Sequence, residues 1–123
     1  MRILSALALI CGLLAAPLGN LSVALAAGAI AVVDEEGADP ADIGYGVGYG
    51  ENRDEAAKGA MAECRKAGNK GCKIAVRFDT CGAYAASKTH YGVGWGDSKA
   101  IASSKALAEC GGSCKLVVAD CDE

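Results

Sequence analysis

The chain of 123 residues has only one histidine, His90, so a site that needs two histidines from one chain cannot form. A histidine-based zinc site is implausible for this reason. A hydrolytic triad would have to place His90 beside a nucleophile, and the available serines lack the nucleophile-elbow motif. These serines are Ser87, Ser98, Ser103 and Ser104. Asp34 and Glu36 could do acid–base work, but charges beside an acidic loop are usually solvated. We therefore predict no catalytic residue, no metal site and no cofactor.

The chain also lacks a phosphate-binding glycine loop. No G-x-x-x-x-G-K sequence followed by Ser or Thr is present, and Tyr49 occupies the last glycine position of G-x-G-x-x-G in the run at residues 44–50. The helix expected next opens with Glu51, Asp54 and Glu55, whose charges would repel a phosphate from its positive end. Nucleotide binding is therefore not expected.

A basic block is absent as well. The 12 Lys and Arg residues and the 15 Asp and Glu residues are mixed along the chain. This argues against nucleic acid and anionic membranes as partners. There is also no interdomain linker and no low-complexity stretch.

The N-terminus has the features of a signal peptide. Arg2 precedes an apolar run at residues 3–16, and Ala24-Leu25-Ala26 fits an A-x-A cleavage site. A retained membrane anchor is the weaker interpretation, because Pro17 interrupts the run before the roughly 20 residues that a span needs. We predict removal of residues 1–26, a single domain at 27–123, and a secreted or periplasmic location without membrane insertion.

Cleavage would remove Arg2 and Cys11. The net charge would change from −3 to about −4, since one cation and no acidic residue is lost. A lipoprotein site at Cys11 is disfavoured because Ile10 stands where a small residue is expected. An even number of cysteines in a small exported domain predicts a disulfide framework. The six that remain are Cys64, Cys72, Cys81, Cys110, Cys114 and Cys121.

The chain contains an ungapped repeat between residues 44 and 110. Residues 44–64, GYGVGYGENRDEAAKGAMAEC, align with residues 90–110, HYGVGWGDSKAIASSKALAEC, at a constant offset of 46. Each copy joins a glycine-rich strand to an alanine-rich helix. A short apolar strand precedes each copy, at residues 28–34 and 82–86.

The duplicated unit is therefore predicted to be strand, glycine strand, helix, strand, over about 28–80 and 81–123. We predict an α+β fold with a mostly antiparallel sheet and two helices on one face. Asn52 and Glu55 resemble a capping box at the start of the first helix. The second helix is expected to start at Asp97 or Ser98. Residues 35–43 are expected to form a solvated acidic loop.

The repeat also narrows the disulfide pairing. In each copy one cysteine ends the helix and another opens the next strand. A redox-active pair is disfavoured, because Cys110 lies at a helix C-terminus, where the dipole does not stabilise a thiolate. The predicted bridges are Cys64–Cys72, Cys110–Cys114 and, by elimination, Cys81–Cys121.

Alternate residues of a strand share a face. In the strand at 44–50 the glycines lie on one face, and the second copy divides in the same way. Glycine in a strand often marks close backbone approach, so we predict that the helices lie on the glycine faces. The alternation in residues 72–78 predicts that Ile74, Val76 and Phe78 face the helices too.

The opposite face would combine aromatic rings with cations. Exposed aromatic patches tend to mark interaction sites, where Arg is also enriched, and rings suit stacking on sugars. The alternative is that these rings are core residues, covered by residues 28–34, a second sheet or a dimer partner. The candidate binding residues are Tyr45, Tyr49, Tyr91, Trp95, Arg77, Lys73 and Lys115.

Several motifs resemble the bacterial secreted family called domain of unknown function 4189. They are Gly28-Ala-Ile-Ala-Val, Gly44-Tyr-Gly, Cys81-Gly-Ala-Tyr-Ala, Gly94-Trp-Gly and the spacing of the six cysteines. The resemblance implies an exported or periplasmic protein with a small disulfide-bonded domain, and it brings no activity. The expected function is a non-catalytic binding module for an envelope glycan or partner protein. The alternative is a small extracytoplasmic enzyme acting on envelope polymers, which a pocket gathering His90 with carboxylates would favour.

Overall fold

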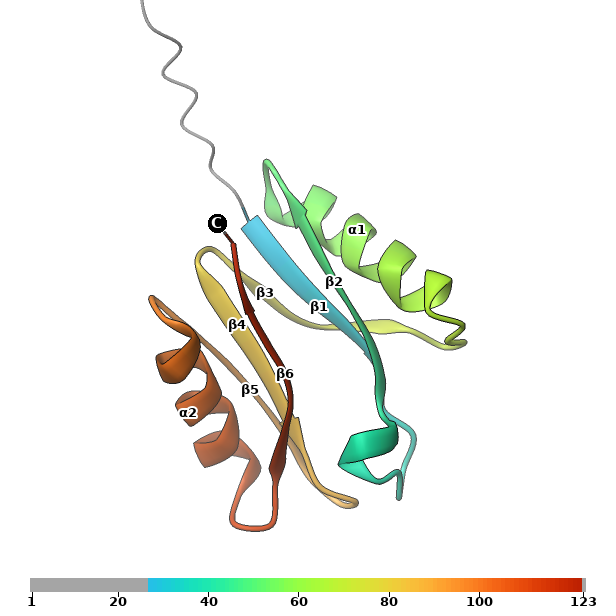
Figure 1. Ribbon diagram of the computed structural model, residues 1–123, viewed down its shortest axis with the longest axis vertical. Coiled ribbons are helices and arrows are strands. Elements are labelled where there is room, and N and C mark those ends of the chain that lie inside the picture. Colours follow the sequence, from blue (N-terminus) through green and yellow to red (C-terminus); the bar gives the residue numbers. More distant parts are fainter. Residues whose placement is uncertain (1–26, 123) are drawn as a thin grey trace, which may run out of the picture.

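The computed structural model describes residues 27–122 and contains two units with the same order of elements (Figure 1). The first unit consists of β1 (Ala27–Val33), η1 (Pro40–Asp42), β2 (Gly44–Gly50), α1 (Arg53–Lys66) and β3 (Lys73–Phe78). The second consists of β4 (Cys81–Ala86), β5 (Tyr91–Gly96), α2 (Lys99–Cys110) and β6 (Lys115–Cys121). The predicted signal peptide lies outside the described residues.

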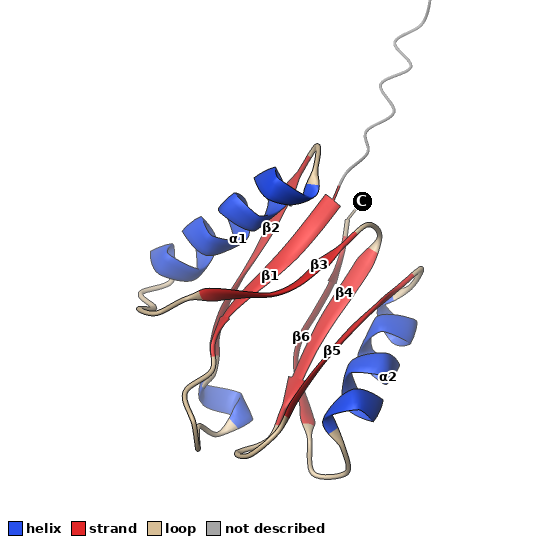
Figure 2. Ribbon diagram, turned by 180° about the vertical axis from the view of Figure 1, so that it is seen from behind, coloured by secondary structure: helices blue, strands red, loops and turns tan. Residues whose placement is uncertain are grey.

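The strands form two antiparallel sheets, in the orders β2-β1-β3 and β5-β4-β6. The two sheets pack face to face, and each carries one helix on its outer face (Figures 1 and 2). The α+β class and the strand–strand–helix–strand order are confirmed. A single sheet with both helices on one face is not what forms, because β1 and β4 each pair on both sides with strands of their own unit. Each unit thus completes its own sheet, and the other unit covers that sheet's inner face.

The glycines of β2 and β5 let the helices approach the sheets, as predicted. A Cβ on Gly48 would overlap the backbone of Ala56 and Ala60 in α1. A Cβ on Gly94 would overlap the backbone of Ala102 and Ala106 in α2. Alanines on the facing sides of both helices are fully buried. The helix layers are therefore held by close backbone contact rather than by large side chains.

Both helices begin at the predicted caps. The Asn52 side chain accepts a hydrogen bond of 2.9 Å from the Glu55 amide. The Ser98 hydroxyl accepts one of 3.1 Å from the Ile101 amide, so Ser98 rather than Asp97 is the cap of α2. Each cap satisfies an amide that the first helical turn leaves without a partner.

An irregularity in the pairing of β1 with β3 overturns the predicted parity of β3. The register shifts between Ile30 and Ala31. Ile74 packs on the α1 side as predicted, but Val76 and Phe78 face the opposing sheet. A bulge adds one residue to one strand, so the side chains beyond it change faces. The same shift occurs between β4 and β6.

The core between the sheets is built around Phe78. Its ring is 1 % exposed, and a Cβ on either Gly28 or Gly82 would overlap it. These glycines occupy matching positions on the two central strands, β1 and β4. The other large buried side chains of this layer include Ile30, Val32, Val76 and Tyr84.

All three predicted disulfides are present. Two of them close a helix end onto the strand that follows, within one unit each. The third joins directly opposed residues of β4 and β6. The bridges are Cys64–Cys72, Cys110–Cys114 and Cys81–Cys121.

Candidate functional site

The four exposed aromatic side chains lie on β2 and β5, which are edge strands of their sheets. The predicted aromatic face is covered by the opposing sheet, and Val47 and Val93 at the centre of these strands pack into the core between the sheets. The rings on either side of these valines remain open to solvent. Their exposed fractions are 43 % for Tyr45, 42 % for Tyr49, 62 % for Tyr91 and 55 % for Trp95.

The rings are therefore divided between two edges of the sandwich. We call them the β3–β5 edge, where Tyr91 and Trp95 lie beside β3, and the β2–β6 edge, where Tyr45 and Tyr49 lie beside β6. The structure brings Lys73 and Arg77 to the first edge and places Lys115 at the start of β6.

Arg77 does not share a strand face with the rings, contrary to the predicted parity. The bulge turns it toward α1, where its guanidinium lies 3.7 Å from the Asp54 carboxylate. It still lines the groove beside Trp95. Arg77 and Trp95 therefore line the same groove, although their side chains do not lie on one face of the sheet.

The groove beside Trp95 has a volume of about 460 Å³ and mixes charges of both signs. Arg53 donates three hydrogen bonds to Asp79. Nε and Nη2 donate to Oδ1 at 3.2 and 3.1 Å, and Nη2 also donates to Oδ2 at 3.0 Å. The Arg53 guanidinium holds the pKa of the Asp79 carboxyl below its usual value. Both residues are exposed, so this forked pair offers oriented donors and acceptors to a ligand while adding little stability.

A second groove on the same edge, of about 450 Å³, lies beside Tyr91. The Tyr91 ring stacks on Tyr84, with centroids 6.0 Å apart and an interplanar angle of 22°. Tyr84 is 2 % exposed, and its hydroxyl donates to the Asp34 carboxylate. Burial, and then the hydrogen bond to Asp34, raise the pKa of Tyr84 well above its usual value.

Tyr84 is not among the site residues predicted from the sequence. It occupies the position of Ile30 in the other unit, at the middle of a central strand. A tyrosine that replaces a core aliphatic residue needs a partner for its hydroxyl. That requirement was the available signal, and Asp34 meets it.

His90 lies in the groove beside Tyr91, together with Asp34, Glu36 and Lys73. Its Nδ1 is 2.8 Å from the Thr89 hydroxyl. The Ser87 hydroxyl accepts from the amides of Thr89 and His90, at 3.3 and 3.0 Å. The hydrogen bonds that Ser87 accepts shape the turn between β4 and β5.

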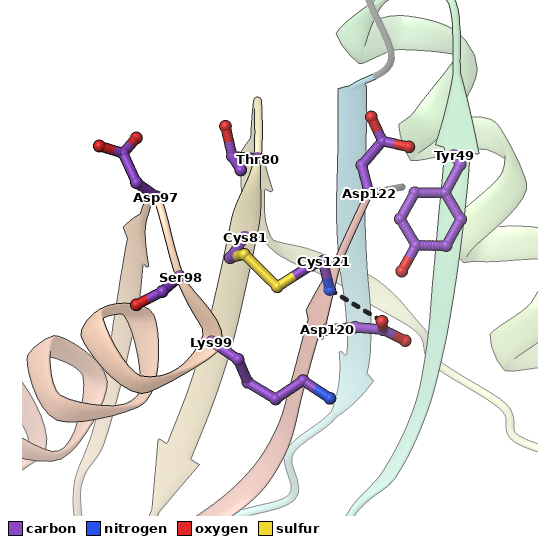
Figure 3. Close-up of a pocket in the computed structure, with 9 residues that line it drawn as sticks. All are labelled: Tyr49, Thr80, Cys81, Asp97, Ser98, Lys99, Asp120, Cys121 and Asp122. Atoms are coloured by element: carbon purple, nitrogen blue, oxygen red, sulfur yellow. Dashed lines mark hydrogen bonds between the residues drawn. A yellow bond between two sulfur atoms is a disulfide. The ribbon is translucent and has the colours of Figure 1, made fainter.

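The β2–β6 edge ends in a groove of about 760 Å³, shown in Figure 3. The Tyr49 ring faces the carboxylates of Asp120 and Asp122 across this groove. Burial, and then the nearby Asp120 carboxylate, raise the pKa of Tyr49 well above its usual value. The Cys121 amide donates to Asp120 at 2.8 Å.

The remaining side chains of this groove come from the turns at one end of the sandwich. They are Thr80, Cys81, Asp97, Ser98 and Lys99. Within residues 27–122, no group of three His, Cys, Asp or Glu side chains has the geometry to hold a metal ion. In the same part of the chain, no helix is long and apolar enough to cross a membrane.

Fold and edges together define a disulfide-bonded α+β sandwich with aromatic rings along two open sheet edges. The family model described as a domain of unknown function (DUF4189) matches residues 27–121, and the chain belongs to this family. No curated protein and no solved structure matches the chain.

Proposed function

We propose that the chain is an exported, non-catalytic binding module that contacts an envelope glycan or a partner protein through one of its two aromatic edges. The observation that carries this proposal is the exposure of four rings, each 42 % or more exposed. Three of them, Tyr49, Tyr91 and Trp95, lie beside open grooves. Small folded domains rarely leave large rings in solvent without a use, and exposed aromatic patches tend to mark interaction sites. The opposing sheet buries the valines between the rings and leaves the rings themselves free.

Export is supported by the cysteines. Three disulfides among residues 64–121 are compatible with an extracytoplasmic location, since such bonds form and persist in oxidising compartments. The proposal adds that residues 1–26 are removed on export. The intact mass of protein recovered from the periplasm or the medium should lack these residues. Recovery of a full-length, membrane-retained chain would contradict export.

Binding is tested by capture from envelope and culture-medium fractions on immobilised, disulfide-bonded protein. We expect a discrete glycan or protein to be retained, and expect the double variant Tyr91→Ala and Trp95→Ala to lose it. The matched control is Leu116→Ala, because Leu116 is 43 % exposed but lies on β6, at the other edge of the sheet from Tyr91 and Trp95. Capture by none of the proteins would reject the binding function, and equal capture by all three would show that neither Tyr91 nor Trp95 contacts the retained partner.

The alternative, a small enzyme acting on envelope polymers, has one observation in its favour. His90 shares a groove with Asp34 and Glu36, as a general acid–base site would require. The binding proposal expects the purified protein to release no soluble fragments from envelope polymers. Release by the wild-type protein that His90→Gln abolishes would establish the enzyme instead.

A further inference from the structure

We infer that the β3–β5 edge is the binding site and that its ligand is a linear glycan of several sugar units. This inference rests on the proposed binding function and adds the edge and the class of ligand. The β2–β6 edge, which carries the equivalent rings of the other unit, is not the binding site.

Tyr91 and Trp95 are placed to contact an elongated ligand. They are four residues apart on β5 and point to the same side, which separates their Cα atoms by about 13 Å at the usual rise of a strand. Each ring lies beside its own groove, of about 450 and 460 Å³. A single sugar ring cannot cover both side chains, whereas a chain of sugars following β5 can.

The rings of this edge are also more available than those of the other edge. Tyr91 and Trp95 are 62 % and 55 % exposed, against 43 % and 42 % for their equivalents, Tyr45 and Tyr49. Tyr49 is committed to the fold, because its ring contacts Phe78 edge-on, with centroids 6.5 Å apart. Tyr91 rests on the buried ring of Tyr84, and this stacking holds its plane in place before a ligand arrives.

The polar groups of the two grooves suit hydroxyl groups. A sugar hydroxyl both donates and accepts hydrogen bonds. The groove at Trp95 offers Arg77 beside the Arg53–Asp79 pair, and the groove at Tyr91 offers Lys73 beside Asp34. Each groove thus presents both donors and acceptors. A polyanion or a polycation would be attracted by part of this lining and repelled by the rest.

A peptide strand fits the edge less well. Partner strands commonly join a sheet by pairing with the free backbone of an edge strand. On β5 the amide of Val93, midway between the two rings, donates to the Glu109 carboxylate at 3.4 Å. This side chain covers the centre of the edge, in the way that proteins protect edges against strand addition. The ligand therefore meets the rings and not the backbone.

The inference is tested by the fluorescence of Trp95, which is the only tryptophan of the chain. The probes are linear hexasaccharides of glucose and of N-acetylglucosamine, the matching monosaccharides, and soluble polysaccharide from bacterial envelopes. We expect at least one chain-form probe to change the emission in a saturable manner. Its monosaccharide should bind at least about tenfold more weakly, because it engages one ring and not two.

The duplication supplies matched controls for each ring. Trp95→Ala and Tyr91→Ala should each weaken binding by about tenfold or more, as expected for an aromatic anchor. Tyr49→Ala and Tyr45→Ala should leave binding unchanged, with circular dichroism confirming that every variant is folded. Isothermal calorimetry replaces fluorescence for Trp95→Ala.

Three outcomes would overturn the inference. Losses of equal size at Tyr45 and Tyr91 would show that the edge is wrong. Equal affinity for monosaccharide and hexasaccharide would show that the ligand does not span two rings. If no glycan binds while the capture experiment retains a protein through Tyr91 and Trp95, the glycan is rejected and the proposed binding function stands. Failure of the capture experiment would reject the binding function itself.

Discussion

At the scale of single residues, glycine is required where a strand passes beneath a helix. At Gly48 and Gly94 a Cβ would meet helix backbone, which cannot move aside as a flexible side chain can. The period of two in the sequence predicted this contact, because only glycines occupy that face of β2. The helix and the strand therefore determine each other's spacing.

Gly48→Val and Gly94→Val should each destabilise the fold by about 1–3 kcal/mol or more, as expected for overpacking in a close-packed layer. Gly112→Val is the control, since a Cβ there would meet nothing within 4 Å. Urea unfolding under non-reducing conditions measures the difference. If both strand variants unfold like wild type, the helices do not lie on the glycine faces.

Tyr84 should make the folding stability fall at alkaline pH. Burial, and then its hydrogen bond to Asp34, raise its pKa above the usual value of 10.0. The fold thus favours the neutral phenol, so this contribution is complete below about pH 10 and is lost as the pH rises through the folded-state pKa. Tyr84→Phe should cost about 0.5–1.5 kcal/mol at neutral pH, the usual net value of one hydrogen bond.

The comparison is made by urea unfolding of wild type and Tyr84→Phe between pH 7 and pH 11. The variant should lose less stability above pH 10 than wild type, because its ring cannot ionise. The control is Tyr91→Phe, whose ring is 62 % exposed. The same loss of stability above pH 10 in wild type and in Tyr84→Phe would contradict a role for this hydroxyl.

At the scale of elements, the sequence predicted both helices, their caps and the cysteine pairs. The repeat made this possible because each helix and each cysteine could be compared with its equivalent in the other copy. It did not predict the parity of β3. A bulge is a property of two paired strands, and nothing in residues 73–78 alone indicates that Ala75 is the extra residue. For that reason the predicted faces of Val76, Phe78 and Arg77 were wrong.

The three disulfides should differ in how much they stabilise the fold. Cys81–Cys121 spans 40 residues and Cys110–Cys114 spans 4. On the chain-entropy model these loops correspond to about 4 and about 2 kcal/mol. The double Cys→Ala variant of the long bridge should therefore melt well below that of the short one. Equal melting temperatures would count against the model, and a mapped peptide joining Cys64 to Cys110 would overturn the pairing.

At the scale of the whole molecule, alternation along a strand shows which residues share a face but not what covers that face. The covering layer is the other unit, so the valines of the aromatic faces became core. The rings stayed exposed because β2 and β5 lie at sheet edges. The candidate residues could thus be named from the sequence, whereas their division between two edges depends on how the sheets pack.

The emission of Trp95 tests most directly whether this edge is open. Its ring is 55 % exposed, and it is the only tryptophan, so one spectrum reports on one side chain. In the disulfide-bonded monomer, established by light scattering, we expect a red-shifted emission that acrylamide quenches readily. A blue-shifted emission that resists acrylamide in a proven monomer would place the ring in the core. It would remove the aromatic edge on which the proposed binding function depends.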